Sequence, residues 1–309
     1  SFEGHPNNTT EEHLATLHIL GFDRVSFGIQ DFDLKVQQAI HREQPFETVV
    51  QITEAARRIG YTSINFDLIY GLPHQNKETL SQTFGKVMDL KPERIAFYSY
   101  AHLPALFKAQ KSFEQFLPNE NDKRALYELG KNILTKSGYE EVGMDHFALP
   151  EDPLCKAKSE GSLHRNFMGY TTSPSKLMIG LGATSISDIH LGFAQNEKGH
   201  KEYIRKINEG SDYLVRSHEN SASDLIVKEF ILDLICHQEA RIDSEIWNRL
   251  PELNRRKLAE MQEEELISIK DQIIKVSDFG MNFIRNICFQ FDLKMLEAPQ
   301  AKSTFSKSI

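Results

Sequence analysis

The chain has 309 residues, of which 40% are hydrophobic and 26% charged, and its formal net charge is −8 at pH 7. These values are typical of a globular protein with about two domains, at roughly 100–200 residues per domain. The negative charge argues against a surface that binds nucleic-acid phosphates, so we expect no nucleic-acid partner. The sequence has no run of about 18 apolar residues, so we expect no membrane span.

Strand-like and helical segments alternate along the first half of the chain. The expected strands are residues 24–30, 63–71, 94–101 and 140–148, and the expected helices are residues 10–20, 46–59, 77–90 and 119–137. Gly60 and Gly138 follow helices as stop signals. Repeated αβ units predict a parallel sheet with helices outside, either doubly wound or a (β/α) barrel, which periodicity does not separate.

Polar residues stand where these strands are expected to end, and ligands bind at that edge of a parallel sheet. They are Gln30 with Asp31, Asp67, His102, and Asp145 with His146. Each residue could instead cap the next helix, but the presence of polar residues at four or five strand ends favours a ligand site. Residues 177–189, an apolar segment that contains glycine, are interpreted as a further strand that runs into a turn.

The chain changes character near Asn220. Expected helices at 222–237, 243–250, 251–265 and 278–292, with a strand-like segment at 266–276, resemble a winged-helix module. Its basic residues 255–257 are followed closely by four glutamates, so we interpret this face as solvated rather than DNA-binding. The expected domains are residues 1–215 and 216–309, with residues 298–309 as a flexible tail.

The three cysteines, Cys155, Cys236 and Cys288, lie far apart in the sequence. Their odd number and spacing argue against a disulfide framework and fit a reducing, cytoplasmic environment. No two are close enough to form a metal-ligand motif, so we expect free thiols and no metal ligand from this chain.

Seven phrases carry a family resemblance: GIQDF at 28–32, HREQ at 41–44, FDLIYGLPHQ at 66–75, YAHLP at 100–104, GMDHFA at 143–148, HRNFMGYTT at 164–172 and IRNIC at 284–288. In this order they resemble the oxygen-independent coproporphyrinogen III oxidases, or coproporphyrinogen dehydrogenases, of the radical S-adenosylmethionine (SAM) superfamily. The implied fold class is α/β: a partial (β/α) radical-SAM barrel that lacks its first units, plus a small, mostly helical, winged-helix-like carboxyl-terminal domain.

The resemblance also implies the chemistry. In that family a [4Fe–4S] cluster and SAM generate a 5′-deoxyadenosyl radical, which removes hydrogen from a propionate side chain. Loss of CO₂ and an electron leaves a vinyl group. Two propionates react, so coproporphyrinogen III becomes protoporphyrinogen IX in haem biosynthesis. Two SAM molecules per active site, a cytosolic electron donor and a monomeric enzyme are implied as well.

The resemblance assigns site residues by motif. Glu3 would accept a hydrogen bond from the methionine amino group. Gln30 and Arg42 would hold the first SAM, the guanidinium suiting its carboxylate, and Asp67 would bind the ribose. Two further cofactor contacts, through backbone or apolar surface, are implied at Ala101 and Ile186. The suggested substrate contacts are His164, Arg165 and Tyr170, and no catalytic residue is assigned.

The chain departs from the family in lacking both the CxxxCxxC cluster motif and the glycine-rich segment after it. We therefore expect an amino-terminally truncated chain that by itself binds no cluster and shows no turnover. Two alternatives stay open: a related haem chaperone that binds haem and passes it on, and a non-catalytic barrel that serves as an interaction module. HRNFMGYTT favours the oxidase over the chaperone.

Overall fold

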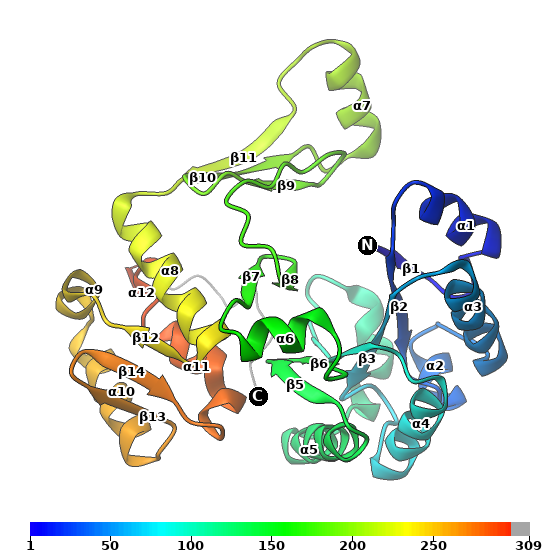
Figure 1. The fold of residues 1–309 in the computed structure, drawn as a ribbon, viewed down its shortest axis with the longest axis horizontal. Coiled ribbons are helices and arrows are strands. Elements are labelled where there is room, and N and C mark those ends of the chain that lie inside the picture. The colour runs from blue at the N-terminus through cyan, green and yellow to red at the C-terminus, as the bar shows by residue number, and fades with distance from the viewer. Residues whose placement is uncertain (298–309) are drawn as a thin grey trace. The chain divides into compact units, whose positions relative to one another are not determined.

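The computed structural model describes residues 1–297, which fall into two compact units, residues 1–159 and 160–297 (Figure 1). The expected tail at 298–309 lies outside the described residues. The expected boundary between domains follows residue 215. In the structure this position lies inside the second unit, within the strand Leu214–Glu219, and the division into these two domains stays a prediction.

The first unit alternates strands and helices in the expected order. Its elements are β1 (Phe2–Gly4), α1 (Glu11–Ile19), β2 (Arg24–Gln30), α2 (Leu34–Ala39), α3 (Phe46–Ile59), β3 (Ser63–Tyr70), α4 (Lys77–Leu90), β4 (Arg94–Ser99), the 3₁₀ segment η1 (Lys108–Phe116), α5 (Glu120–Lys136), β5 (Glu140–Gly143), β6 (His146–Ala148) and α6 (Pro153–Ser159). Gly60 adopts φ 114° directly after α3, which confirms the predicted stop.

The strands of the first unit form one sheet in the order β1-β2-β3-β4-β6-β5. The first four are parallel, as the αβ repeats predicted, because each helix carries the chain back to the start of the next strand. The interpretation of residues 140–148 as one strand is wrong. They form an antiparallel hairpin, and its second strand, β6, lies between β4 and β5.

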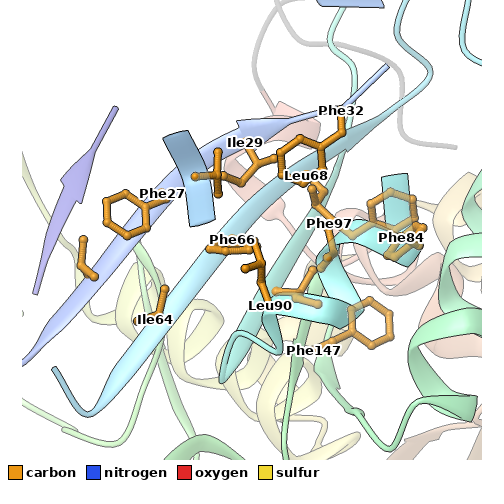
Figure 2. Packing of buried hydrophobic residues seen from close by; sticks show 14 of the residues in the cluster. Phe27, Ile29, Phe32, Ile64, Phe66, Leu68, Phe84, Leu90, Phe97 and Phe147 are labelled. Carbon is orange, nitrogen blue, oxygen red and sulfur yellow. The ribbon is translucent and has the colours of Figure 1, made fainter. Parts of the chain in front are cut away.

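The helices α1, α3, α4 and α5 follow one another along the sheet, each in contact with the next. The core lies between these helices and the sheet. Phe27 and Ile29 of β2, Phe66 of β3 and Phe97 of β4 are at most 1% exposed. Figure 2 shows these side chains packed together with Phe84 of α4. Because side chains alternate along a strand, burying this face leaves the opposite face of the sheet for polar groups.

The second unit contains two small sheets, a hairpin and a helical bundle. Its elements are β7 (His164–Asn166), β8 (Gly169–Thr171), β9 (Ile186–Asp188), β10 (Gly192–Asn196), α7 (His200–Asn208), β11 (Leu214–Glu219), α8 (Ala222–His237), β12 (Glu239–Arg241), α9 (Ser244–Arg249), α10 (Glu252–Glu263), β13 (Ile267–Lys270), β14 (Ile273–Val276), the 3₁₀ segment η2 (Gly280–Phe283), α11 (Ile284–Phe289) and α12 (Leu293–Glu297).

The elements from α8 to β14 have the order helix, strand, helix, helix, hairpin, with the sheet order β12-β14-β13. This arrangement agrees with the expected winged-helix-like module. The expected strand at 177–189 shortens to Ile186–Asp188, with Met178 bridged to Asp188. Of the helices within residues 1–297, none combines the length and apolar character that a membrane crossing requires.

Candidate functional site: a polar sheet face and a cationic hairpin

The polar face of the first unit's sheet is built by strand register. Ser26 of β2 lies opposite Asn65 of β3, and Gly28 lies opposite Asp67. Glu3 of β1 pairs with Ser26 on the other side. These residues all fall on the face that the buried phenylalanines leave free, so three neighbouring strands present polar groups to one side of the sheet.

Asp67 lies in the middle of β3 rather than at its carboxyl end, and its carboxylate is held in a fixed position. Ser26 Oγ donates to Oδ2 at 2.9 Å, and Asn65 Nδ2 donates to Oδ1 at 2.8 Å and to Ser26 Oγ at 2.8 Å. Burial raises the pKa of Asp67, Glu3 adds to the rise, and the two hydrogen bonds and Arg42 oppose it. Each oxygen accepts one of these bonds, which leaves acceptor capacity for a ligand hydroxyl.

Arg42 and Gln30 converge over Gly28. Arg42 Nη2 donates to the Gly28 carbonyl at 2.8 Å, while its Nε is buried without a hydrogen-bond partner among the described residues. A Cβ on Gly28 would lie 2.8 Å from Arg42 Nη2 and 2.9 Å from Gln30 Nε2. Glycine therefore leaves room for both side-chain ends beside Asp67. Burial lowers the pKa of Arg42, and Asp67 opposes that shift.

A buried network fixes the strand ends from which these side chains project. Gln30 has a left-handed backbone, with φ 67°. The next residue, Asp31, accepts hydrogen bonds from Asp33 N at 2.7 Å, Thr83 Oγ1 at 2.7 Å and Gln75 Nε2 at 2.6 Å. Gln75 also donates to the Ile69 carbonyl at 2.9 Å, so a single side chain ties the end of β2 to the end of β3. Burial raises the pKa of Asp31, which these hydrogen bonds oppose.

Ala101 lies in the loop after β4, which two long side chains hold in place. Its carbonyl accepts from Gln110 Nε2 at 3.1 Å, and the preceding Tyr100 carbonyl accepts from Lys123 Nζ at 2.8 Å. Asp145 and His146 were expected at the carboxyl end of a strand, but they do not lie there. Asp145 lies in the turn of the hairpin, and His146 begins β6. The ring of His146 meets that of Tyr98 edge-on at 5.9 Å between centroids.

The other predicted site residues belong to the second unit. His164, Arg165 and Tyr170 lie on the β7–β8 hairpin, where Arg165 and Tyr170 are directly opposite each other. The Arg165 guanidinium lies 4.7 Å from the centroid of the Tyr170 ring, a cation–π contact. Ile186 begins β9 and pairs with Gln195. The structure thus brings together Gln30, Arg42 and Asp67, with Glu3 one strand away, and in the second unit it brings together the three hairpin residues.

The sequence pattern missed Ser26, Gly28 and Asn65. Asn65 could have been found, because a residue two positions before Asp67 shares its face of the strand. The importance of Gly28 depends on register with β3 and on Arg42, neither of which is visible locally.

The described residues do not suit an iron–sulfur cluster. All three cysteines are free and buried, and they lie on the separate helices α6, α8 and α11. Within residues 1–297, no group of three or more His, Cys, Asp or Glu side chains is arranged to hold a metal ion. Burial raises the pKa of Cys155 and Cys236 to about 11 and that of Cys288 to about 12.

Comparisons with known proteins agree on one family. The Radical SAM superfamily model matches residues 2–87. The chain is 38% identical over 300 residues to oxygen-independent coproporphyrinogen III oxidase of Escherichia coli K12, and 37% identical over 299 residues to the protein of that name from Helicobacter pylori J99. Both alignments cover 94% of this chain and 65% of the relative, so the chain spans about two-thirds of the length of these relatives.

A solved structure gives the same result. Coproporphyrinogen III oxidase from Escherichia coli, described as a radical SAM enzyme, matches with a TM-score of 0.86 and 37% identity. The match covers 94% of this chain and 68% of that one.

Proposed function

Because the chain belongs to the oxygen-independent coproporphyrinogen III oxidase family of radical SAM enzymes, we propose that it carries SAM-binding and substrate-binding residues of such an oxidase. The proposed reaction is the anaerobic oxidative decarboxylation of coproporphyrinogen III to protoporphyrinogen IX. The observation that carries the proposal is the convergence of Gln30 and Arg42 over Gly28, beside the fixed carboxylate of Asp67.

This arrangement fits SAM in its donors and acceptors. The buried Nε of Arg42 offers an unused donor to the methionine carboxylate, and a guanidinium matches a carboxylate in geometry and charge. The remaining lone pairs of Asp67 can accept from ribose hydroxyls. Glu3, on β1 at the other side of β2, supplies an acceptor for the methionine amino group. When bound, SAM supplies the hydrogen-abstracting radical chemistry of the superfamily.

The remaining assignments are proposals of the same kind. Ala101 and Ile186 would contact SAM, of which the active site would hold two. The three hairpin residues, His164, Arg165 and Tyr170, would face substrate carboxylates. The [4Fe–4S] cluster of the family has no ligand set among the described residues, so we assign no residue of this chain to it.

We further propose that the protein works in the cytoplasm as a monomer and receives electrons from a cytosolic donor. The free, buried thiols fit a reducing compartment. The oligomeric state and the donor rest on the family alone.

The test is turnover by the protein that contains this chain, purified without oxygen and supplied with SAM, a reductant and coproporphyrinogen III. We expect protoporphyrinogen IX, measured by fluorescence after oxidation to protoporphyrin. Asp67→Asn should raise the KM for SAM and leave the KM for coproporphyrinogen unchanged, whereas Asp23→Asn, at an exposed carboxylate of the same unit, should change neither. Haem binding without conversion would instead favour the haem chaperone, and the absence of both would favour a non-catalytic module.

A further inference from the structure

The second unit contains a cavity of about 380 Å³. Its walls come from the β7–β8 hairpin, residues 173–178, the strands β9 and β10, and helix α8. The volume lies near the lower end of the roughly 300–1,000 Å³ that ligand pockets span. The cavity therefore suits one arm of a large ligand or a small ligand as a whole.

The lining combines apolar surface with an excess of permanent positive charge. Arg165, Lys176 and Lys228 line the cavity together with two carboxylates, Asp188 and Glu229. The apolar part includes Phe167, Leu177, Phe193 and Leu232. Burial lowers the pKa of His164, the nearby charges of Lys228 and His237 lower it further, and Asp188 opposes the shift. Such a lining selects an anionic group attached to an apolar body.

Arg165 has an unused donor at this cavity. Its Nη1 is buried and finds no hydrogen-bond partner within residues 1–297, while the face of the guanidinium is occupied by the Tyr170 ring. A buried donor of a charged group without a partner is unfavourable, and a ligand acceptor would remove that cost. The β7–β8 register holds Arg165 in place opposite Tyr170.

Lys228 is held by an internal carboxylate. Its Nζ lies 3.0 Å from Asp188 Oδ2 and 3.2 Å from Oδ1, and 4.8 Å from the centroid of the Phe193 ring. Asp188 is itself fixed, because its Oδ1 accepts from His190 N at 2.9 Å and its backbone pairs with Met178. A ligand carboxylate that reaches Lys228 must therefore compete with Asp188 for the ammonium group.

We propose that this cavity is a carboxylate subsite, in which Arg165 and Lys228 bind the anionic end of a ligand arm while Phe167 and Phe193 contact its hydrocarbon part. The chemistry of the lining defines the class, a carboxylate on an apolar or aromatic body. The identity of the ligand arm rests on the proposed function. The arm is one propionate of the tetrapyrrole, which this cavity anchors while the rest of the tetrapyrrole lies outside it.

The first test measures binding of coproporphyrin III, the stable oxidised form that keeps the four propionates, to the purified chain by fluorescence titration. Lys228→Met should weaken binding by about tenfold, the effect of losing one charge-assisted contact. The tetramethyl ester, which lacks anionic carboxylates, should bind the variant and the unaltered chain equally. Lys206→Met is the matched control, because Lys206 pairs with Glu197 at 2.9 Å with similar exposure but outside the cavity lining.

A second variant should change the affinity for coproporphyrin III in the opposite direction, which simple misfolding would not do. Asp188→Asn keeps an oxygen for His190 N but removes the charge that competes for Lys228, so coproporphyrin III should bind several-fold more tightly. Unchanged affinity in both variants, or a loss in both, would overturn the subsite. The proposed function can fail separately from the subsite. If the anaerobic assay shows no turnover but the two substitutions change affinity in opposite directions, the subsite stands and the oxidase activity does not.

Discussion

Substituting Gly28 by alanine should separate ligand binding from stability. The new Cβ would lie 2.8 Å from Arg42 Nη2 and 2.9 Å from Gln30 Nε2, so both side-chain ends must move. Arg42 would lose its bond to the Gly28 carbonyl and its position beside Asp67. Both groups are the ends of flexible side chains, so the backbone need not move.

The magnitudes follow from these contacts. Alanine gains about 0.4–1 kcal/mol by restricting the unfolded chain, which offsets a net loss of about 1 kcal/mol for the hydrogen bond from the half-buried Arg42. The free energy of unfolding should therefore change by less than about 1 kcal/mol. A displaced charged donor costs ligand affinity about 1.5–3 kcal/mol, a rise in Kd for SAM of about tenfold to a hundredfold.

Equilibrium dialysis with radiolabelled SAM, alongside urea unfolding followed by circular dichroism, measures both quantities. Gly85→Ala is the control, because a Cβ there meets nothing within 4 Å and lies within α4. It should raise the free energy of unfolding by about 1 kcal/mol and leave the Kd unchanged. If Gly28→Ala bound SAM as tightly as the unaltered chain, Arg42 and Gln30 would not be the SAM contacts that we propose.

Three further predictions concern the interior. Gly130→Ala should lower the free energy of unfolding by about 1–3 kcal/mol in urea melts, because its Cβ would lie 2.6 Å from Cζ of the buried Phe97. Gln75→Glu would set a second carboxylate against Asp31 and lower stability by about 3 kcal/mol at neutral pH. Since burial already raises the pKa of Asp31, the loss of stability relative to the unaltered chain should be smallest below about pH 4 and grow as pH rises, seen as a difference in urea midpoint that widens with pH. All three cysteines should resist iodoacetamide at pH 8 until urea unfolds the chain, because burial raises each thiol pKa to about 11 or 12. Rapid labelling of the folded chain, judged by mass spectrometry, would contradict their burial.

Most elements of the first unit could be predicted from the sequence, because the residues that begin and end them lie within or next to each segment. Four helices carry caps or stops, and the strand at residues 24–30 was found to the residue. The helix Leu34–Ala39 was missed because six residues are too few for helical periodicity to show. The hairpin was taken for one strand because the left-handed position of its turn, with φ 47°, is held by Met144 and not by the neighbouring Gly143 or Asp145.

The candidate site likewise contains residues that the sequence identifies and residues that it does not. Asp67 stands in a recognisable phrase, and the family resemblance supplied its partners Gln30 and Arg42. The positions that make room for them or hold them, Gly28 and Gln75, depend on contacts between segments far apart in the chain. Pairing of β2 with β3 and packing of α4 against Asp31 decide these contacts, and neither leaves a local signal.

The β5–β6 hairpin has a consequence for how such a protein can diverge. The parallel strands are linked by crossover helices, so a change in the length of one link must be absorbed across the sheet. The turn at Met144 reverses the chain without a crossover helix, so residues can be added or removed there most easily on the side away from Asp145, whose carbonyl accepts from Phe97 N of β4 at 2.7 Å. Because β6 pairs with β4 and brings His146 against Tyr98, such changes would act on the polar face directly. The hairpin is thus a place where a change in loop length can alter the polar face without altering a crossover helix.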